Sequence, residues 1–199
     1  MSYLMDQGRK PLVLEKTGAG KLYYRLGLRY APQSLRLPPE EQGFSVEREY
    51  EAVEGKDTVT RIDGTRWRIK AGKYVRVRLR IVVPSQRYFV AVDDPLPAGL
   101  EAVDLTLKTS ASSSLGNAAK NTIYDFHSWY AFFAFSHREK RDDRVVLFSD
   151  RLPSGVYEYT YLARSTTIGT FVVPPLKAEE MYHPEVFGRN GTNTVEVVP

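Results

Sequence analysis

Residues 73–83 read Lys-Tyr-Val-Arg-Val-Arg-Leu-Arg-Ile-Val-Val, and this stretch decides the fold class. Every second side chain in it is apolar: Val75, Val77, Leu79, Ile81 and Val83. Arginines occupy the positions between them, at Arg76, Arg78 and Arg80. Alternation at period two over this length predicts a strand with one face in a hydrophobic core and the other in water.

Similar patterns lie on both sides of this stretch. Residues 20–31 alternate, with one face formed by Leu22, Tyr24, Leu26, Leu28 and Tyr30. Residues 58–62 and 65–70 flank Asp63-Gly64, which predicts a β-hairpin with a type I′ turn and with Trp67 and Ile69 facing the core. Residues 155–164 place three tyrosines on one side: Tyr157, Tyr159 and Tyr161. Further short strands are predicted over 44–53, 88–93, 100–108, 144–149, 168–173 and 194–198.

No long amphipathic helix competes with these strands, and prolines at 38–39, 95, 97 and 174–175 mark strand ends. The predicted fold is all-β, an antiparallel β-sandwich with an irregular loop or short helix and an extended C-terminal segment. The predicted core contains Leu22, Leu26, Leu28, Trp67, Val77, Leu79, Ile81, Val90 and Val92.

A length of 199 residues fits one domain. Within a single domain spanning 1–199, we expect residues 1–12 to be a linker or loosely ordered. The small polar residues of 109–122 indicate a mobile loop. Residues 174–199 are expected to form a C-terminal loop and strand.

Composition excludes several function classes. The chain contains no cysteine, so disulfides, thiolate metal sites and a cysteine nucleophile are absent. Its net charge of +4 is too small to indicate nucleic acid as a partner unless it gathers on one face. The first residues do not predict a signal peptide, and the sequence has no run of roughly 18 apolar residues. A cytoplasmic protein and a fragment of a longer exported protein are both compatible with these features.

The sequence contains no complete catalytic or ligand-binding motif. Gly18-Ala19-Gly20-Lys21 lacks the earlier glycine and the Ser or Thr of a phosphate loop, which favours a turn. The histidines, His127, His137 and His183, lack the spacing of a metal site. Asp93-Asp94 and Asp142-Asp143 are adjacent, so on a strand their carboxylates point to opposite faces. We interpret them as a turn at Asp94-Pro95 and an ion-paired run over 141–144. The sequence therefore predicts no enzyme, no metal and no cofactor.

The arginines of 73–83 could bind a polyanion, together with Arg66, Arg68 and Lys70. However, Glu47, Glu49 and Glu51 share one face of another predicted strand. Opposite charges across neighbouring strands stabilise a sheet by roughly 0.2–1 kcal/mol per pair. We therefore expect the arginines to be matched within the sheet.

Several longer segments of the sequence resemble a known protein family. They are KTGAGKLYY (16–24), YFVAVDDPLPAGLE (88–101), HREKRDDRV (137–145), GVYEYTY (155–161), GTF (169–171), PPLKAEEMY (174–182) and PEVFGR (184–189). In this order the strings cover nearly the whole chain and resemble the C-terminal domain of bacterial α2-macroglobulins.

The resemblance implies a non-catalytic domain of a periplasmic protease trap, whose parent is in many cases tied to the inner membrane by a lipid at a distant N-terminus. Many such traps capture proteases through a Cys–Gln thioester, which this cysteine-free chain cannot carry. Its implied partners are the thioester domain and neighbouring macroglobulin domains of the parent, and target proteases indirectly. Neither nucleic acid nor direct membrane contact is expected.

Two residues are implied to shield the thioester from water, Met181 and Tyr182, and the following His183-Pro184 favours a loop there. Alternatively, Met181 and Tyr182 could belong to the domain's own core. A different class of function is a free-standing β-sandwich module that binds carbohydrate or a surface protein through tyrosines such as Tyr23, Tyr157, Tyr159 and Tyr161. An exposed aromatic strip would favour that module, whereas buried tyrosines would favour the trap domain.

Overall fold

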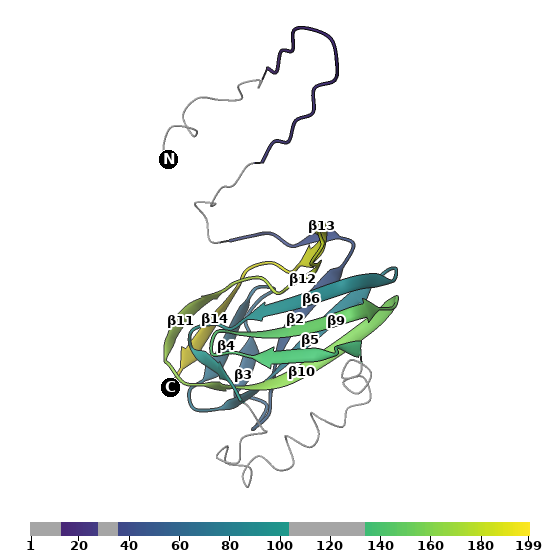
Figure 1. The fold of residues 1–199 in the computed structure, drawn as a ribbon. Helices are drawn as coiled ribbons and strands as arrows, with labels where there is room; N and C mark the ends of the chain where they lie inside the picture. Colours follow the sequence, from purple (N-terminus) through teal and green to yellow (C-terminus); the bar gives the residue numbers. More distant parts are fainter. Residues whose placement is uncertain (1–12, 28–35, 104–133) are drawn as a thin grey trace. The chain divides into compact units, whose positions relative to one another are not determined.

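The structure is a computed structural model that describes residues 13–27, 36–103 and 134–199. The chain divides into two units, Met1–Gln33 and Ser34–Pro199. All strands of the described residues belong to the second unit, where they form three sheets (Figure 1). Within those residues, no helix has the length and apolar character needed to cross a bilayer.

The first sheet has six strands, whose spatial order is β1 (Glu40–Gln42), β13 (His183–Arg189), β12 (Lys177–Glu180), β6 (Arg87–Pro95), β9 (Arg144–Leu152) and β8 (His137–Lys140). The second has four: β2 (Ser45–Ala52), β5 (Tyr74–Val83), β10 (Gly155–Ser165) and β7 (Leu100–Ala102). The third also has four: β11 (Gly169–Val173), β14 (Asn193–Val198), β4 (Arg66–Lys70) and β3 (Val59–Arg61). Paired strands run antiparallel, except that β14 runs parallel to β4.

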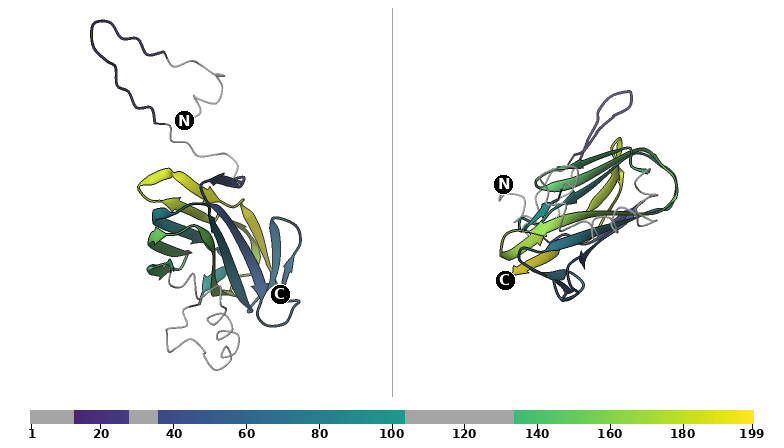
Figure 2. Two further views of the ribbon diagram at one scale, coloured as in Figure 1. Left: turned by 90° about the vertical axis from the view of Figure 1, so that its right-hand side faces the viewer. Right: turned by 90° about the horizontal axis from the view of Figure 1, so that it is seen from below.

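One hydrophobic core joins the three sheets. Buried side chains reach it from β6 and β9 in the first sheet, from β2, β5 and β10 in the second, and from β4 and β14 in the third. Figure 2 shows the teal and green strands of the first sheet on one side of the blue strands β2 and β5. The antiparallel β-sandwich predicted from the alternating strands is therefore confirmed.

Strand β5 has the predicted alternation, because Val75, Val77, Leu79, Ile81 and Val83 are all buried. The charge matching is confirmed as well. The register places Glu47 opposite Arg80, Glu49 opposite Arg78 and Glu51 opposite Arg76. Arg78 bonds to the Glu49 carboxylate and lies 3.2 Å from Glu51. These arginines are thus paired across β2 and β5.

The hairpin of β3 and β4 forms with Trp67 and Ile69 buried, but its turn differs from the predicted type I′. That turn needs positive φ at both central residues, and neither Asp63 nor Gly64 has it. Instead, the Asp63 carboxylate accepts hydrogen bonds from the backbone N–H groups of Thr65 and Arg66. The side chain of Asp63 closes a longer loop, which removes the need for a left-handed backbone.

The strand predicted over 20–31 is wrong where the structure describes it, because residues 20–27 form no strand. Leu22 and Leu26 are 49% and 72% exposed and do not belong to the core. Leu28 lies outside the described residues. A strand needs a partner strand for its backbone hydrogen bonds, and the alternating pattern of these residues does not provide one. Gly18 and Gly20 have positive φ, in keeping with the predicted turn there.

The structure also differs from two predictions about where strands begin and end. Residues 174–199 contribute three strands, β12, β13 and β14, where one strand was expected. The turn expected at Asp94-Pro95 is displaced, since β6 continues to Pro95 and Asp94 is buried. The expected linker at 1–12 and loop at 109–122 lie outside the described residues.

Candidate interface at the tip of the β12–β13 hairpin

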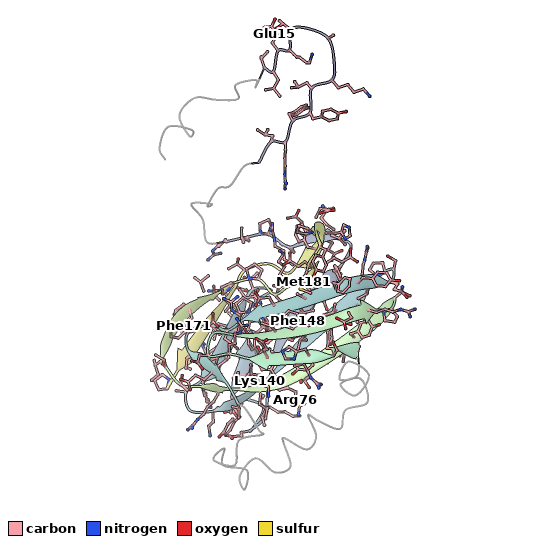
Figure 3. The ribbon with its side chains drawn as sticks, viewed as in Figure 1. Glu15, Arg76, Lys140, Phe148, Phe171 and Met181 are labelled. Carbon is pink, nitrogen blue, oxygen red and sulfur yellow. The ribbon has the colours of Figure 1, made fainter. Side chains whose placement is uncertain are left out.

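Met181 and Tyr182 form the turn between β12 and β13. Their side chains are 44% and 71% exposed, so the alternative that they belong to the domain's own core is contradicted. Figure 3 shows Met181 at the end of this hairpin, beside β6. A large aromatic side chain that is mostly exposed is the informative exception on a protein surface, because burying it would be favourable.

Phe89 of β6 lies against this turn. Its ring meets the ring of Tyr182 edge to face, with centroids 5.1 Å apart and planes at 87°. The backbone N–H of Met181 donates to the carbonyl oxygen of Phe89 over 2.9 Å. Phe89 is itself 45% exposed. We call Phe89, Met181 and Tyr182 together the apolar tip.

A carboxylate fixes the hairpin to β6 from the other side. The backbone N–H of Tyr88 donates to Oε1 of Glu180, 3.0 Å away, and the Glu180 side chain is only 12% exposed. Its second oxygen lies 3.8 Å from Nδ1 of His183. The pairing of β12 with β13 is irregular between Glu179 and Glu180, whose partners on β13 are Phe187 and His183. Two hydrogen bonds therefore hold the tip to β6, one through Glu180 at the end of β12 and one through Met181 in the turn.

The other end of the hairpin is fixed just as firmly. The Asn190 side chain accepts from the backbone N–H of Leu176 over 2.7 Å, and the Asn190 N–H donates to the Leu176 carbonyl. Gly188 of β13 packs so closely on the backbone of Phe44 that a Cβ there would lie 2.2 Å from the carbonyl oxygen. Only glycine permits this approach.

A buried polar cluster supports the chain just before β12. Nη1 of Arg48 lies 2.7 Å from Oδ1 of Asp94, and both side chains are fully buried. Nη2 of Arg48 donates to the carbonyl of Pro174 over 2.9 Å, and Nη1 donates to the carbonyl of Pro95 over 3.1 Å. The hydroxyl of Tyr161 donates to Oδ2 of Asp94 over 2.6 Å. Arg48 thus connects β2, β6 and the turn that leads into the hairpin.

Tyr161 stays protonated in this cluster. Burial, and then the neighbouring Asp94 carboxylate, raise the pKa of Tyr161 well above its ordinary value. The cluster was not predicted from the sequence, although a signal was present. Arg48 alternates with Val46 and Tyr50 on the core side of β2, opposite the Glu47, Glu49 and Glu51 face. A cation at such a position requires a buried partner.

The tyrosines of β10 form no exposed platform. Tyr157, Tyr159 and Tyr161 are 2%, 7% and 3% exposed. The hydroxyl of Tyr157 donates to the carbonyl of Pro153, as that of Tyr161 does to Asp94. An aromatic strip for sugar stacking on this strand is therefore contradicted, and its tyrosines belong to the core.

The polar residues considered for chemistry have structural partners or lie apart. His137 lies 3.1 Å from Glu139, His183 is exposed at the tip, and His127 is outside the described residues. Over residues 13–27, 36–103 and 134–199, no three His, Asp or Glu side chains come together as a metal site would need. Within the predicted run 141–144, Arg144 pairs with Asp143 at 2.9 Å, and it also reaches Asp93.

Comparison with known proteins identifies the domain. The family model described as the bacterial α2-macroglobulin MG10 domain matches residues 43–185. An α2-macroglobulin homolog from Nostoc is 32% identical over 93% of this chain and 9% of its own length. A protein from Dictyostelium discoideum named circularly permutated Ras protein 2 is 29% identical over 96% of this chain and 4% of its own length.

A solved structure agrees with these sequence relatives. It is Salmonella α2-macroglobulin reacted with methylamine, which superimposes with a TM-score of 0.64 and 25% identity over 84% of this chain and 10% of that one. The chain therefore spans a tenth or less of the length of each of these three proteins. Since the family model covers well over half of the chain, the chain belongs to the MG10 domain family of bacterial α2-macroglobulins.

Proposed function

We propose that the chain is a non-catalytic domain of a longer bacterial α2-macroglobulin-type protease inhibitor, in which Met181 and Tyr182 pack on the thioester domain and shield the thioester from water. The observation that carries this proposal is the exposure of Met181 and Tyr182 on a hairpin that is hydrogen bonded at both ends. A domain that needed these side chains for its own stability would bury them.

The chemistry of the tip suits a shield. A thioester is lost when water attacks its acyl carbon, the carbon–sulfur bond breaks and a carboxylate and a thiol are left. Exclusion of water from the acyl carbon slows this reaction. Met181 offers a flexible apolar side chain that adapts to an irregular surface, and Tyr182 offers a broad ring with a polar edge. The solved Salmonella relative is described as reacted with methylamine, which supports an amine-reactive group in proteins of this family.

The partners follow from the same proposal. They are the thioester domain and neighbouring macroglobulin domains of the parent protein, and target proteases only indirectly. We propose that the parent is periplasmic and that a lipid at its distant N-terminus anchors it to the inner membrane. The arginines of β5 are paired with glutamates of β2, which argues against a free basic face for nucleic acid.

The test changes both tip residues, Met181→Ala with Tyr182→Ala, in the full-length parent. We expect faster consumption of methylamine by the resting trap. The amine nitrogen forms an amide with the acyl carbon and releases one cysteine thiol, which a thiol reagent counts. Cleavage of the bait by protease should be unchanged, since the tip does not carry the bait.

A matched control removes two exposed apolar side chains elsewhere, Ile168→Ala with Val172→Ala, which are 59% and 47% exposed near and on β11. The control should release thiol at the wild-type rate. Equal thiol release by the tip variant, the control and the wild type would contradict the shielding function, as would a resting parent that releases no thiol with methylamine.

A further inference from the structure

The backbone of β6 is strained at the apolar tip. Phe89 has φ of +49°, and among the described residues it is the one residue other than glycine with positive φ. Side chains with a Cβ rarely adopt this left-handed conformation, because the Cβ crowds the following carbonyl oxygen. Such outliers persist where the surroundings hold them, and they cluster at binding and switching sites.

The strain changes where the side chains of β6 point. Val90 and Val92 are buried and alternate in the ordinary way with Ala91 and Asp93. Tyr88 and Phe89 break this alternation, since both are exposed although they are neighbours in the strand. A regular strand would carry only one of two neighbours on its outer face. The conformation of Phe89 therefore presents its ring at the surface beside Tyr182.

Three interactions hold Phe89 in this conformation, and each of them joins β6 to the hairpin. The Phe89 carbonyl accepts from the Met181 N–H, the preceding N–H of Tyr88 donates to Glu180, and the Phe89 ring packs edge to face on Tyr182. Contacts within β6 contribute none of the three. The strained backbone and the hairpin turn form one unit.

We propose that Phe89 is a third residue of the docking surface, one that orients the ring of Tyr182 and adds its own exposed face toward the thioester domain of the same parent chain. This inference rests on the proposed function of the tip. Tyr182 is 71% exposed and would otherwise sample several rotamers. Fixing its ring before docking removes part of the entropy cost of association.

The partner surface must accept two rings held at right angles and a thioether beside them. Its chemistry is therefore an apolar hollow, bordered by a hydrogen-bond acceptor or water for the Tyr182 hydroxyl. No charge is needed at its centre, because the three side chains of the tip are uncharged. A flat or charged surface would leave the Phe89 edge or the Tyr182 hydroxyl poorly matched.

The test uses Phe89→Gly, Phe89→Ala and Phe89→Tyr in the full-length parent, with the Met181→Ala/Tyr182→Ala variant as reference. Phe89→Gly removes the ring and also relaxes the strained backbone, so loss of shielding cannot be attributed to a destabilised fold. We expect Phe89→Gly and Phe89→Ala to release thiol to methylamine roughly two- to tenfold faster than wild type, the range that corresponds to one aromatic pair. Phe89→Tyr keeps the ring edge and should restore most of the protection.

A double-mutant cycle separates positioning from packing alone. With Tyr182→Ala already present, Phe89→Ala should accelerate thiol release less than it does alone, because part of its effect acts through Tyr182. If Phe89→Gly releases thiol at the wild-type rate while the Met181→Ala/Tyr182→Ala variant is fast, the role of Phe89 is wrong and the shielding function stands. If both have the wild-type rate, both proposals fail. Additive effects would contradict the positioning of Tyr182 by Phe89.

Discussion

The Arg48 cluster offers the sharpest test of how the hairpin is supported. We consider Arg48→Met, which keeps an unbranched side chain of similar length but removes the charge and every donor. The variant loses the 2.7 Å ion pair with Asp94 and the hydrogen bonds to the carbonyls of Pro95 and Pro174. Among the residues that the structure describes, only the Tyr161 hydroxyl then remains on the Asp94 carboxylate.

The expected loss is large because both charged side chains are fully buried. Removing one partner of a buried ion pair typically destabilises a protein by about 3–5 kcal/mol, since the remaining charge is left uncompensated. A domain of this kind has a free energy of unfolding of roughly 5–15 kcal/mol. Arg48→Met should therefore unfold at much lower urea concentration, with an unchanged dependence of the free energy on urea.

The loss of unfolding free energy in Arg48→Met should depend on pH, and the titration of Asp94 determines whether it grows or shrinks as the pH falls. Burial already raises the pKa of the Asp94 carboxyl, and Arg48 is the main opposing influence. Without Arg48 the folded-state pKa rises further above the unfolded value. A raised pKa means that the folded state binds the proton more tightly, so stability is regained at low pH and lost as pH rises through the folded-state pKa. The deficit of Arg48→Met relative to wild type should shrink from neutral pH toward pH of about 4.

The assay is urea unfolding of the 199-residue chain, followed by tryptophan fluorescence at both pH values. Adding Asp94→Asn to Arg48→Met should recover stability at neutral pH, because the uncompensated carboxylate is gone. A deficit below about 1 kcal/mol at neutral pH would refute our reasoning, since that is the range of exposed ion pairs. A deficit independent of pH would show that Asp94 is not the residue left uncompensated.

Three further outcomes are expected for the same chain. Met181→Ala with Tyr182→Ala should change the free energy of unfolding of the chain by less than about 1 kcal/mol, because both side chains are largely exposed. A large drop in melting temperature would show that the two side chains belong to the core. Phe89→Gly should be more stable than Phe89→Ala by about 0.5–1 kcal/mol, as glycine tolerates positive φ, although it adds entropy to the unfolded state. A Phe89→Gly variant that is less stable than Phe89→Ala by about 0.4–1 kcal/mol, the ordinary cost of glycine, would mean that no strain exists. The Asp63 carboxyl should titrate in an NMR experiment well below its ordinary range, because hydrogen bonds from the backbone N–H of Thr65, and then from the Arg66 side chain, lower its pKa. This lowered pKa stabilises the fold above the ordinary pKa of Asp, and that contribution is lost as pH falls through the folded value; an ordinary titration would contradict the turn geometry.

Strands in the second sheet could be predicted from sequence because their pattern is local. The alternation in 73–83 assigned each side chain of β5 to its face, and the glutamates at 47, 49 and 51 predicted their own partners. The same rule failed for residues 20–27, where alternating side chains have no partner strand among the described residues of their unit. An alternating pattern predicts that a strand has one apolar face. Burial of that face also requires a neighbouring strand and a second sheet to cover it, which the pattern does not predict.

Pairings between distant segments had no local signal. The parallel pairing of β14 with β4 joins residues more than a hundred positions apart, and the pairing of β12 with β6 also joins segments that are distant in the sequence. At the candidate site, Met181 and Tyr182 were identified by family resemblance and not by periodicity. Phe89 was missed because it lies within a predicted strand, where its left-handed conformation leaves no trace in residue type.

The support of the hairpin bears on the docking function that we propose for the exposed aromatic turn. An apolar turn that became ordered only on contact would lose conformational entropy in every residue it fixed, at about 1–2 kcal/mol each for the backbone. In this domain the hydrogen bonds of Glu180 and Asn190 hold the two ends of β12, and Arg48 holds the turn before it. Since these bonds already order the turn in the free domain, docking as we propose it would cost little further conformational entropy, and burial of the tip would serve to exclude water.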